Sequence, residues 1–150
     1  MSAPAIRPAR TDEYDEVARV WMESWVSTGL AEASNFLLAN LRARVRHEIE
    51  NGWSLFVADD RGVLAAMLAL NLGENYLDQL FVAPEHQGKK LGRILLAFTR
   101  QQLPDEIWLR CVRENEKAWR WYEREGFVFE KEQLEPTGRV VKYYRWRKSA

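Results

Sequence analysis

Cysteine and histidine are scarce in this sequence, which holds only Cys111, His47 and His86 among its 150 residues. A single cysteine excludes an intramolecular disulfide and any metal site that is made of cysteines alone. The two histidines lack the paired spacing of a zinc site, so we expect no bound metal. A lone thiol is compatible with a reducing compartment, and we expect the protein to be cytoplasmic.

An excess of charge of either sign is also missing, because 22 Lys and Arg balance 22 Asp and Glu. A nucleic-acid-binding domain needs a clustered basic excess, so no nucleic-acid partner is expected. The longest apolar run, 63–70, falls far short of the ~18 residues of a membrane span. Residues 1–10 contain no apolar stretch of the kind that a signal peptide has. We therefore expect no membrane partner.

The composition that remains is that of an ordinary globular protein, with 47% hydrophobic and 29% charged residues. Together with the length, this predicts a single domain over residues 1–150. Tryptophan is unusually frequent, with 7 copies. Each indole buries a large apolar area, so the protein needs a sizeable core or an aromatic pocket.

Hydrophobic periodicity and turn signals predict eleven secondary-structure elements in the order β-α-α-β-β-β-α-β-α-β-β. The expected strands are 5–8, 53–58, 63–70, 76–82, 107–112, 127–129 and 140–146; the expected helices are 11–27, 34–50, 88–103 and 115–125. By propensity 63–70 is equally compatible with a helix, but the preceding turn at 60–62 favours a strand. Strand–helix–strand units and hairpins together predict an α/β fold with a mixed sheet and helices on both faces.

The most informative segment is 84–93, which joins an expected strand to an expected helix. A helix N-terminus offers free backbone N–H groups and the positive end of the helix dipole, so it binds phosphate well. Gly88 and Gly92 allow an anion to approach the backbone, while Lys89, Lys90 and Arg93 add positive charge. From these residues alone, a simple turn with solvated lysines is an equally good interpretation.

Two blocks of residues give the chain a family resemblance. Gln87-Gly88-Lys89-Lys90-Leu91-Gly92 resembles the Gln/Arg-x-x-Gly-x-Gly/Ala motif of the GCN5-related N-acetyltransferase (GNAT) superfamily, and 80–84 resembles the strand before it. The first glycine of that motif is Lys90 here, which brings a Cβ and a long side chain. Asn115, Ala118, Trp121-Tyr122-Glu123 and Gly126-Phe127 resemble the second block of the superfamily.

This resemblance covers most of the chain and implies a GNAT fold with a mostly antiparallel central sheet. It also implies a transferase that moves an acetyl group from acetyl-CoA, its co-substrate, to a primary amine of a small molecule or peptide. The positions that would bind acetyl-CoA are Leu80, Phe81, Val82, Gln87, Gly88, Lys89, Lys90, Leu91, Gly92, Arg93 and Asn115. A non-catalytic, regulatory acyl-CoA-binding module on the same fold is the alternative.

For direct attack by a neutral amine, the resemblance assigns Tyr122 as the acid that protonates the departing thiolate. A phenol with a pKa near ~10 stays protonated at neutral pH and can donate. Asp78 is our candidate base, acting through water, because strand alternation places it on the same face as Leu80. A solvated strand carboxylate is an equally good interpretation of Asp78, and Glu74 is a further candidate. An acyl-Cys111 intermediate is a rival mechanism, but a buried inert thiol is favoured.

The acceptor side is predicted from the first helix, where Trp21 and Trp25 share a face. Aromatic faces attract cationic amines, so we expect Trp25 and Glu23 to bind the acceptor. Core packing is the alternative for both indoles, more so for Trp21. The last expected strand carries Tyr143, Tyr144 and Trp146, and we expect these closing strands to support a homodimer.

Overall fold

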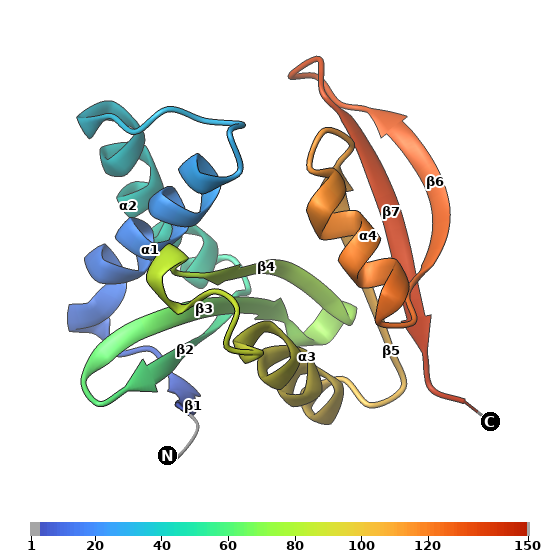
Figure 1. Ribbon diagram of the computed structural model, residues 1–150, viewed down its shortest axis with the longest axis horizontal. Coiled ribbons are helices and arrows are strands. Elements are labelled where there is room, and N and C mark those ends of the chain that lie inside the picture. Colours follow the sequence, from blue (N-terminus) through green and yellow to red (C-terminus); the bar gives the residue numbers. More distant parts are fainter. Residues whose placement is uncertain (1–3, 150) are drawn as a thin grey trace.

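The computed structural model describes residues 4–149, and its elements follow the expected order (Figure 1). The strands are β1 (Ala5–Pro8), β2 (Ser54–Asp60), β3 (Val63–Asn71), β4 (Tyr76–Val82), β5 (Glu106–Val112), β6 (Val128–Leu134) and β7 (Val140–Arg147). The helices are α1 (Tyr14–Ser27), α2 (Asn35–Glu50), α3 (Leu91–Gln102) and α4 (Glu116–Arg124). Short 3-10 segments cover Thr11–Glu13, Leu72–Glu74 and Pro84–His86.

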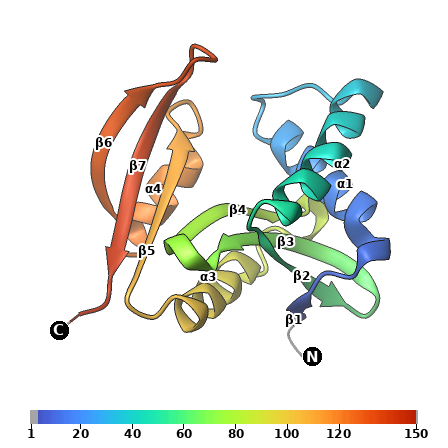
Figure 2. The same cartoon turned by 180° about the vertical axis from the view of Figure 1, so that it is seen from behind.

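The seven strands form one sheet in the order β1-β2-β3-β4-β5-β7-β6. All neighbours are antiparallel except β4 and β5, which pair in parallel at Tyr76 and Trp108. Beyond that pair the two strands separate, and the sheet opens into two halves that Figures 1 and 2 show as a V. The expected mixed, mostly antiparallel sheet is therefore confirmed.

Strand β3 is buried on both faces, which explains its continuous apolar sequence. Met67 and Ala69 pack with residues of α1 and α2 on one face. Leu68 and Leu70 pack on the other face, in a core that includes residues of α3 and α4. The helices thus cover both faces of the sheet, and the strand interpretation of the Ala- and Leu-rich segment is correct.

The beginning of α3 differs from the prediction. The helix starts at Leu91, not at residue 88, because Gly88 and Lys90 adopt left-handed backbone angles that an α-helix does not contain. The three residues before Leu91 therefore form a turn whose backbone is not helical. This turn faces the point where β4 ends.

The sixth strand is longer than predicted. It continues to Leu134 and is an edge strand whose residues are all exposed. Its polar central segment lacks the alternation of apolar and polar residues from which strands are predicted, so the predicted strand ended at residue 129. None of the helices within residues 4–149 combines the length and the apolar character that a bilayer crossing requires.

Candidate active site

A cleft of about 640 Å³ lies where β4 and β5 separate. Its walls come from the end of β4, the turn before α3, the end of α1 and the first turns of α4. The lining residues are Ser24, Ser27, Thr28, Leu80, Phe81, Val82, His86, Gln87, Gly88, Lys90, Leu91, Gly92, Arg93, Glu114, Asn115, Glu116, Lys117, Ala118, Trp121 and Tyr122. We refer to it as the phosphate-side cleft.

The turn before α3 supplies this cleft with backbone donors. In the part of the chain that the structure describes, none of the N–H groups of residues 88–93 donates to a backbone oxygen. The first such bond at this end of the helix runs from Ile94 to Lys90, at 3.2 Å. An array of free N–H groups at the positive end of a helix fits a diphosphate, so these residues suit the coenzyme.

The side chains of the turn have different surroundings. Lys90 and Arg93 line the phosphate-side cleft, and Arg93 also lies 3.6 Å from Glu125. Lys89 is exposed and is not among the lining residues. Leu91 is buried in the core, so its backbone alone is available to a ligand. The contribution of this turn to the charge of the cleft therefore comes from Lys90 and Arg93, while Glu114, Glu116 and Lys117 add charges of both signs from the α4 side.

Gln87 holds the turn in place. Its side-chain nitrogen donates to the carbonyl oxygen of Val82 at 3.1 Å, and the hydroxyl of Ser24 donates to the same oxygen at 2.8 Å. Gly92 lies under Trp121, where a Cβ would come within 3.4 Å of the indole. These contacts fix the turn against β4 on one side and α4 on the other.

The edge of β4 that faces β5 is open beyond Tyr76, because only that residue pairs across the gap. Leu80, Phe81 and Val82 lie on this open stretch and line the cleft. Unpaired strand backbone can form hydrogen bonds with an extended ligand. Asn115 faces it from the start of α4, and its side chain makes no capping hydrogen bond. Its amide is therefore available.

A second cleft of about 370 Å³, the acceptor-side cleft, joins the first. Leu80, Phe81, Asn115, Ala118 and Tyr122 line both. The other lining residues are Trp21, Trp25, Leu37, Leu41, Arg44, Tyr76, Leu77, Asp78, Gln79, Leu109, Arg110, Cys111, Val112 and Val141. A thioester placed at the shared residues would be reachable from both sides.

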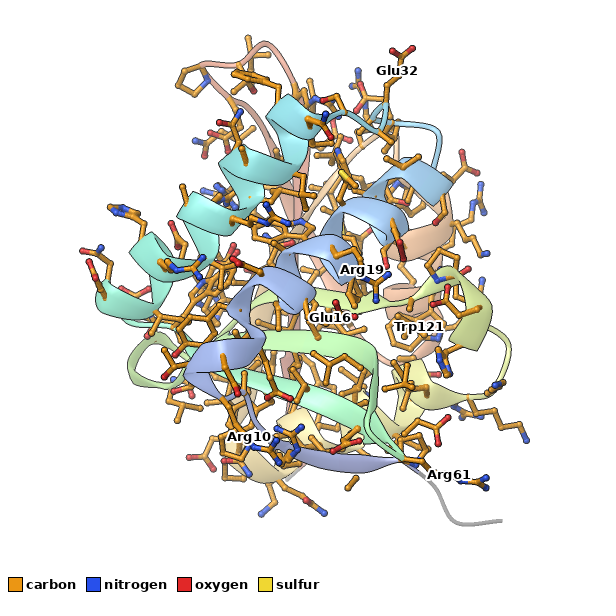
Figure 3. All side chains as sticks on the ribbon, turned by 90° about the vertical axis from the view of Figure 1, so that its left-hand side faces the viewer. Arg10, Glu16, Arg19, Glu32, Arg61 and Trp121 are labelled. Atoms are coloured by element: carbon orange, nitrogen blue, oxygen red, sulfur yellow. The ribbon has the colours of Figure 1, made fainter. Side chains whose placement is uncertain are left out.

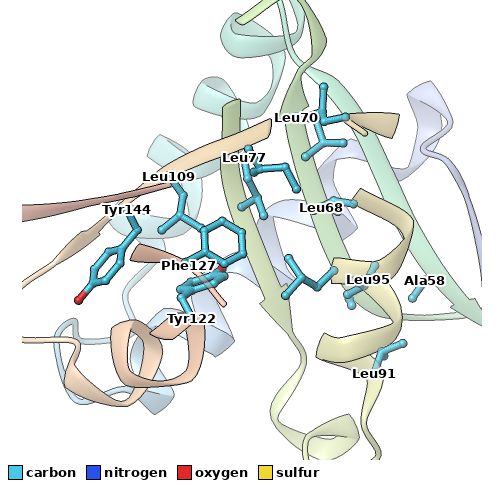
Figure 4. Packing of buried hydrophobic residues seen from close by; sticks show 14 of the residues in the cluster. Ala58, Leu68, Leu70, Leu77, Leu91, Leu95, Leu109, Tyr122, Phe127 and Tyr144 are labelled. Atoms are coloured by element: carbon cyan, nitrogen blue, oxygen red, sulfur yellow. The ribbon is translucent and has the colours of Figure 1, made fainter. Parts of the chain in front are cut away.

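Tyr122 lies at this junction. The side chain is 6% exposed and contacts Phe127, with ring centroids 5.4 Å apart (Figure 4). Burial raises the pKa of its phenol well above the usual 10, because the charged form loses water. The hydroxyl therefore remains protonated throughout the neutral range, as a proton donor must.

Asp78 lies at an irregularity in the pairing of β3 with β4. The β3–β4 register passes from Ala69 opposite Gln79 to Leu70 opposite Leu77, so Asp78 is the extra residue of a bulge. Its carboxylate accepts hydrogen bonds from Trp53 Nε1 at 2.7 Å and from Gln79 Nε2 at 3.0 Å. Asp78 lines the acceptor-side cleft.

The other candidate base, Glu74, is exposed and does not line either cleft. Its side chain lies 3.4 Å from the amide of Asn71. Of the two carboxylates, Asp78 alone lines one of the two clefts.

The structure does not bring Glu23 to either cleft. Arg19 binds its carboxylate through two hydrogen bonds of 2.6 and 2.7 Å. Arg19 also binds Glu16 on the same helix, and Figure 3 labels these two side chains. Trp21, four residues before Trp25, is buried against Trp53. Trp25 is half-buried and lines the acceptor-side cleft with its edge toward Phe81. Both indoles of the predicted pair therefore line this cleft, but Trp21 is buried, and the guanidinium of Arg139 lies 5.7 Å from the centroid of the Trp25 ring.

Cys111 lines the acceptor-side cleft as a thiol. Burial raises its pKa to about 12, and Lys142 offsets this only in part. A thiolate is the nucleophilic form of cysteine, so this environment disfavours the acyl-cysteine mechanism. Within residues 4–149, no three His, Cys, Asp or Glu side chains are grouped in a way that would hold a metal ion.

Two arginines of the acceptor-side cleft were not predicted from the sequence. Arg44 follows Leu37 and Leu41 at helical spacing, so the apolar stripe of α2 could have indicated it. Arg110 lies on β5, and its neighbours in the sequence gave no signal of a ligand site.

Comparisons with known proteins agree with this geometry. The model of the acetyltransferase (GNAT) family matches residues 14–127. A GCN5-related N-acetyltransferase from Rhodopseudomonas palustris superposes with a TM-score of 0.78 at 16% identity, covering 98% of this chain and 97% of that one. No curated protein sequence matches the chain significantly.

Two similar structures contain the coenzyme. The PaiA N-acetyltransferase from Thermoplasma acidophilum, in complex with coenzyme A, has a TM-score of 0.71 at 20% identity and covers 98% of this chain and 99% of that one. The YncA protein of Salmonella typhimurium, a putative acetyltransferase with its cofactor acetyl-CoA, has a TM-score of 0.69 at 15% identity, with coverages of 99% and 96%. At these identities the likeness shows a common fold.

Proposed function

The chain belongs to the acetyltransferase (GNAT) family, and on that premise we propose that it moves an acetyl group from acetyl-CoA to a primary amine. The observation that carries this proposal is the junction of the two clefts at Leu80 and Tyr122. A coenzyme bound in the phosphate-side cleft and an amine bound in the acceptor-side cleft would meet at these shared residues.

We assign the phosphate-side cleft to the coenzyme. The N–H groups of residues 88–93 would hold the diphosphate, with Lys90 and Arg93 adding positive charge. The open edge of β4 at 80–82 and the amide of Asn115 would bind the extended arm. Gln87 acts by holding the turn against Val82.

The reaction is a direct attack, in which the amine nitrogen bonds to the thioester carbonyl carbon and the carbon–sulfur bond breaks. Tyr122 gives its proton to the departing sulfur. Asp78 accepts, through water, the proton that the protonated amine must lose to become a neutral nucleophile. A backbone N–H on the open edge of β4 would polarise the carbonyl as the charge on its oxygen grows. Products are the N-acetylated amine and coenzyme A with a free thiol.

The test is an assay of coenzyme A release with acetyl-CoA and a panel of amino acids, polyamines, aminoglycosides and peptides. Mass spectrometry should find a product heavier by one acetyl group for at least one acceptor. Calorimetric titration with acetyl-CoA should show binding in the absence of any acceptor. If the protein binds acetyl-CoA but acetylates no member of a broad panel, the proposal fails in favour of a non-catalytic acyl-CoA-binding module.

A further inference from the structure

We propose that the acceptor is an amine that carries an anionic group, a carboxylate or a phosphate, on a small apolar body. The inference rests on the proposed function for the identity of the cleft, and it concerns what that cleft selects. It follows from which charged groups line the cleft and which of them are already bound by other protein groups.

Three charged side chains line the acceptor-side cleft: Arg44, Asp78 and Arg110. Arg44 comes from α2 and Arg110 from β5, and these elements belong to different halves of the open sheet (Figures 1 and 2). The cleft therefore carries a cationic group on each of two facing walls and one carboxylate on β4. Among the side chains that line the cleft, positive charges outnumber negative ones, and Glu135, outside the lining, pairs with Arg110 at 3.2 Å.

The guanidinium of Arg44 has N–H donors that are available to a ligand. Its guanidinium carbon lies 5.0 Å from the centroid of the Trp21 ring, and within residues 4–149 no carboxylate oxygen lies within 4.0 Å of it. A guanidinium that stacks on an aromatic face keeps its N–H edge available, and that edge matches the two oxygens of a carboxylate or phosphate.

Arg110 is only partly engaged. Its Nη1 lies 3.2 Å from a carboxylate oxygen of Glu135 and 3.4 Å from the hydroxyl of Tyr143. A guanidinium has five N–H donors, so most of them remain for a ligand. Glu135 fixes the side chain at the cleft wall without occupying all of its donors.

The carboxylates that would favour a cationic acceptor already accept hydrogen bonds from other protein groups. Asp78 already accepts hydrogen bonds from Trp53 and Gln79, and Arg19 binds Glu23 outside the cleft. A polyamine would place several positive charges beside two guanidinium groups, with one carboxylate to pair with. Unpaired like charges select against such a ligand. Asp78 remains suitable for the single amino group that reacts.

The rest of the cleft sets size and polarity. Trp25, Leu37, Leu41, Leu109 and Val141 give it an apolar lining. Its volume of about 370 Å³ lies at the small end of the ~300–1,000 Å³ typical of ligand pockets. An apolar amino acid or a phosphorylated small amine fits this description better than a peptide or an aminoglycoside.

The test compares matched acceptors by calorimetric titration into protein saturated with coenzyme A, so that binding is measured without turnover. Leucine, methionine, phenylalanine and tryptophan are each paired with their amides, which lack the carboxylate charge. Phosphoethanolamine is paired with ethanolamine, and spermidine is the polycation. We expect at least one anionic member to bind at least about tenfold tighter than its partner and tighter than spermidine. Comparison of the amino-acid pairs with the phosphoethanolamine pair shows whether the cleft prefers a carboxylate or a phosphate.

Two variants assign the effect to the cleft. Arg44→Gln and Arg110→Gln should each weaken binding of the preferred anionic member at least about tenfold, with affinity for its uncharged partner and for coenzyme A unchanged. Arg46→Gln is the matched control, because Arg46 lies on the same helix, binds Asp15 and does not line the cleft. Arg44 is on an exposed helical surface, so its replacement should leave folding intact even if loss of Arg110 does not.

The inference is overturned if no anionic member binds tenfold better than its partner, if spermidine binds best, or if Arg44→Gln leaves the preference unchanged. Coenzyme A release is then measured with the preferred ligand. Tight binding of an anionic amine without release would contradict the proposed acetyl transfer but not the anionic site. Release with polyamines alone would contradict the anionic site but not acetyl transfer.

Discussion

Gly88 and Lys90, two residues apart in the turn before α3, both adopt left-handed backbone angles, with φ of 82° and 62°. Glycine adopts this region freely, whereas a residue with a Cβ is strained there. The resemblance places a glycine at the position of Lys90, and the structure shows the backbone geometry that such a glycine would serve. Lys90 keeps the conformation of the turn at a cost in stability.

We therefore predict that Lys90→Gly is more stable than Lys90→Ala by about 1 kcal/mol, because both lose the charge and only glycine loses the strained Cβ. For a chain of this size that difference corresponds to a shift of ~2–4 °C in the midpoint of thermal unfolding. Calorimetry on the two variants measures it. Equal midpoints would show that the left-handed angle of Lys90 carries no strain.

Replacement of Tyr122 by Phe should lower kcat about tenfold or more and leave the affinity for acetyl-CoA within about twofold, because a proton donor acts on the chemical step. Steady-state kinetics and titration with acetyl-CoA separate the two effects. Tyr144→Phe is the control, since its hydroxyl donates to Glu123 at 2.6 Å away from both clefts. Full turnover in the Tyr122 variant would remove this residue from the acid role.

The pH profile gives a second check on Tyr122. Because burial raises the pKa of its phenol, loss of that proton should not reduce kcat at any pH up to 10. A group with a raised pKa in the folded state stabilises the fold at low pH and loses that contribution as pH rises. Stability should accordingly fall above about pH 10, where the unfolded chain ionises its tyrosines.

Asp78→Asn should lower kcat/KM for the acceptor by about tenfold or more at pH 7, because the variant cannot take the surplus proton of the amine. The deficit should shrink as pH rises, since more of the acceptor is then neutral in solution. Glu74→Gln is the matched control on the adjoining 3-10 segment and should match the wild type. A deficit that is independent of pH would indicate a binding role for Asp78.

A pH-dependent contribution to stability is expected from Glu13. Two hydrogen bonds from Arg7, at 2.8 and 2.7 Å, and one from the backbone of Arg10 lower the pKa of its carboxyl to about 2. A lowered pKa stabilises the fold above the ordinary carboxyl pKa and loses this effect as pH falls through about 2. Glu13→Gln should lower the urea midpoint at pH 7, and the difference should vanish toward pH 2. A constant difference would assign the effect to packing.

Much of the fold could be predicted because its signals are local. The turn signal at 60–62, the apolar repeats of α2 and the glycine that ends α4 depend on residues within a few positions of one another. The turn before α3 was likewise predicted as a junction between a strand and a helix, because its glycines, its basic residues and the following helix are contiguous. The helix that was expected to begin at residue 34 is capped there, because the hydroxyl of Ser34 accepts a hydrogen bond from the N–H of Leu37 at 2.9 Å.

The sequence by itself determined the order of the elements and the place of the turn between β4 and α3, because short-range backbone preferences decide both. Only the tertiary structure decided what the acceptor meets. Arg44 and Arg110 reach one cleft because α2 and β5, far apart in the chain, flank the opening between β4 and β5. Glu23 is absent from it, and its carboxylate instead accepts hydrogen bonds of 2.6 and 2.7 Å from Arg19, one helical turn away. Contacts of this kind depend on how the two halves of the sheet separate. The periodicity of the sequence does not predict that separation.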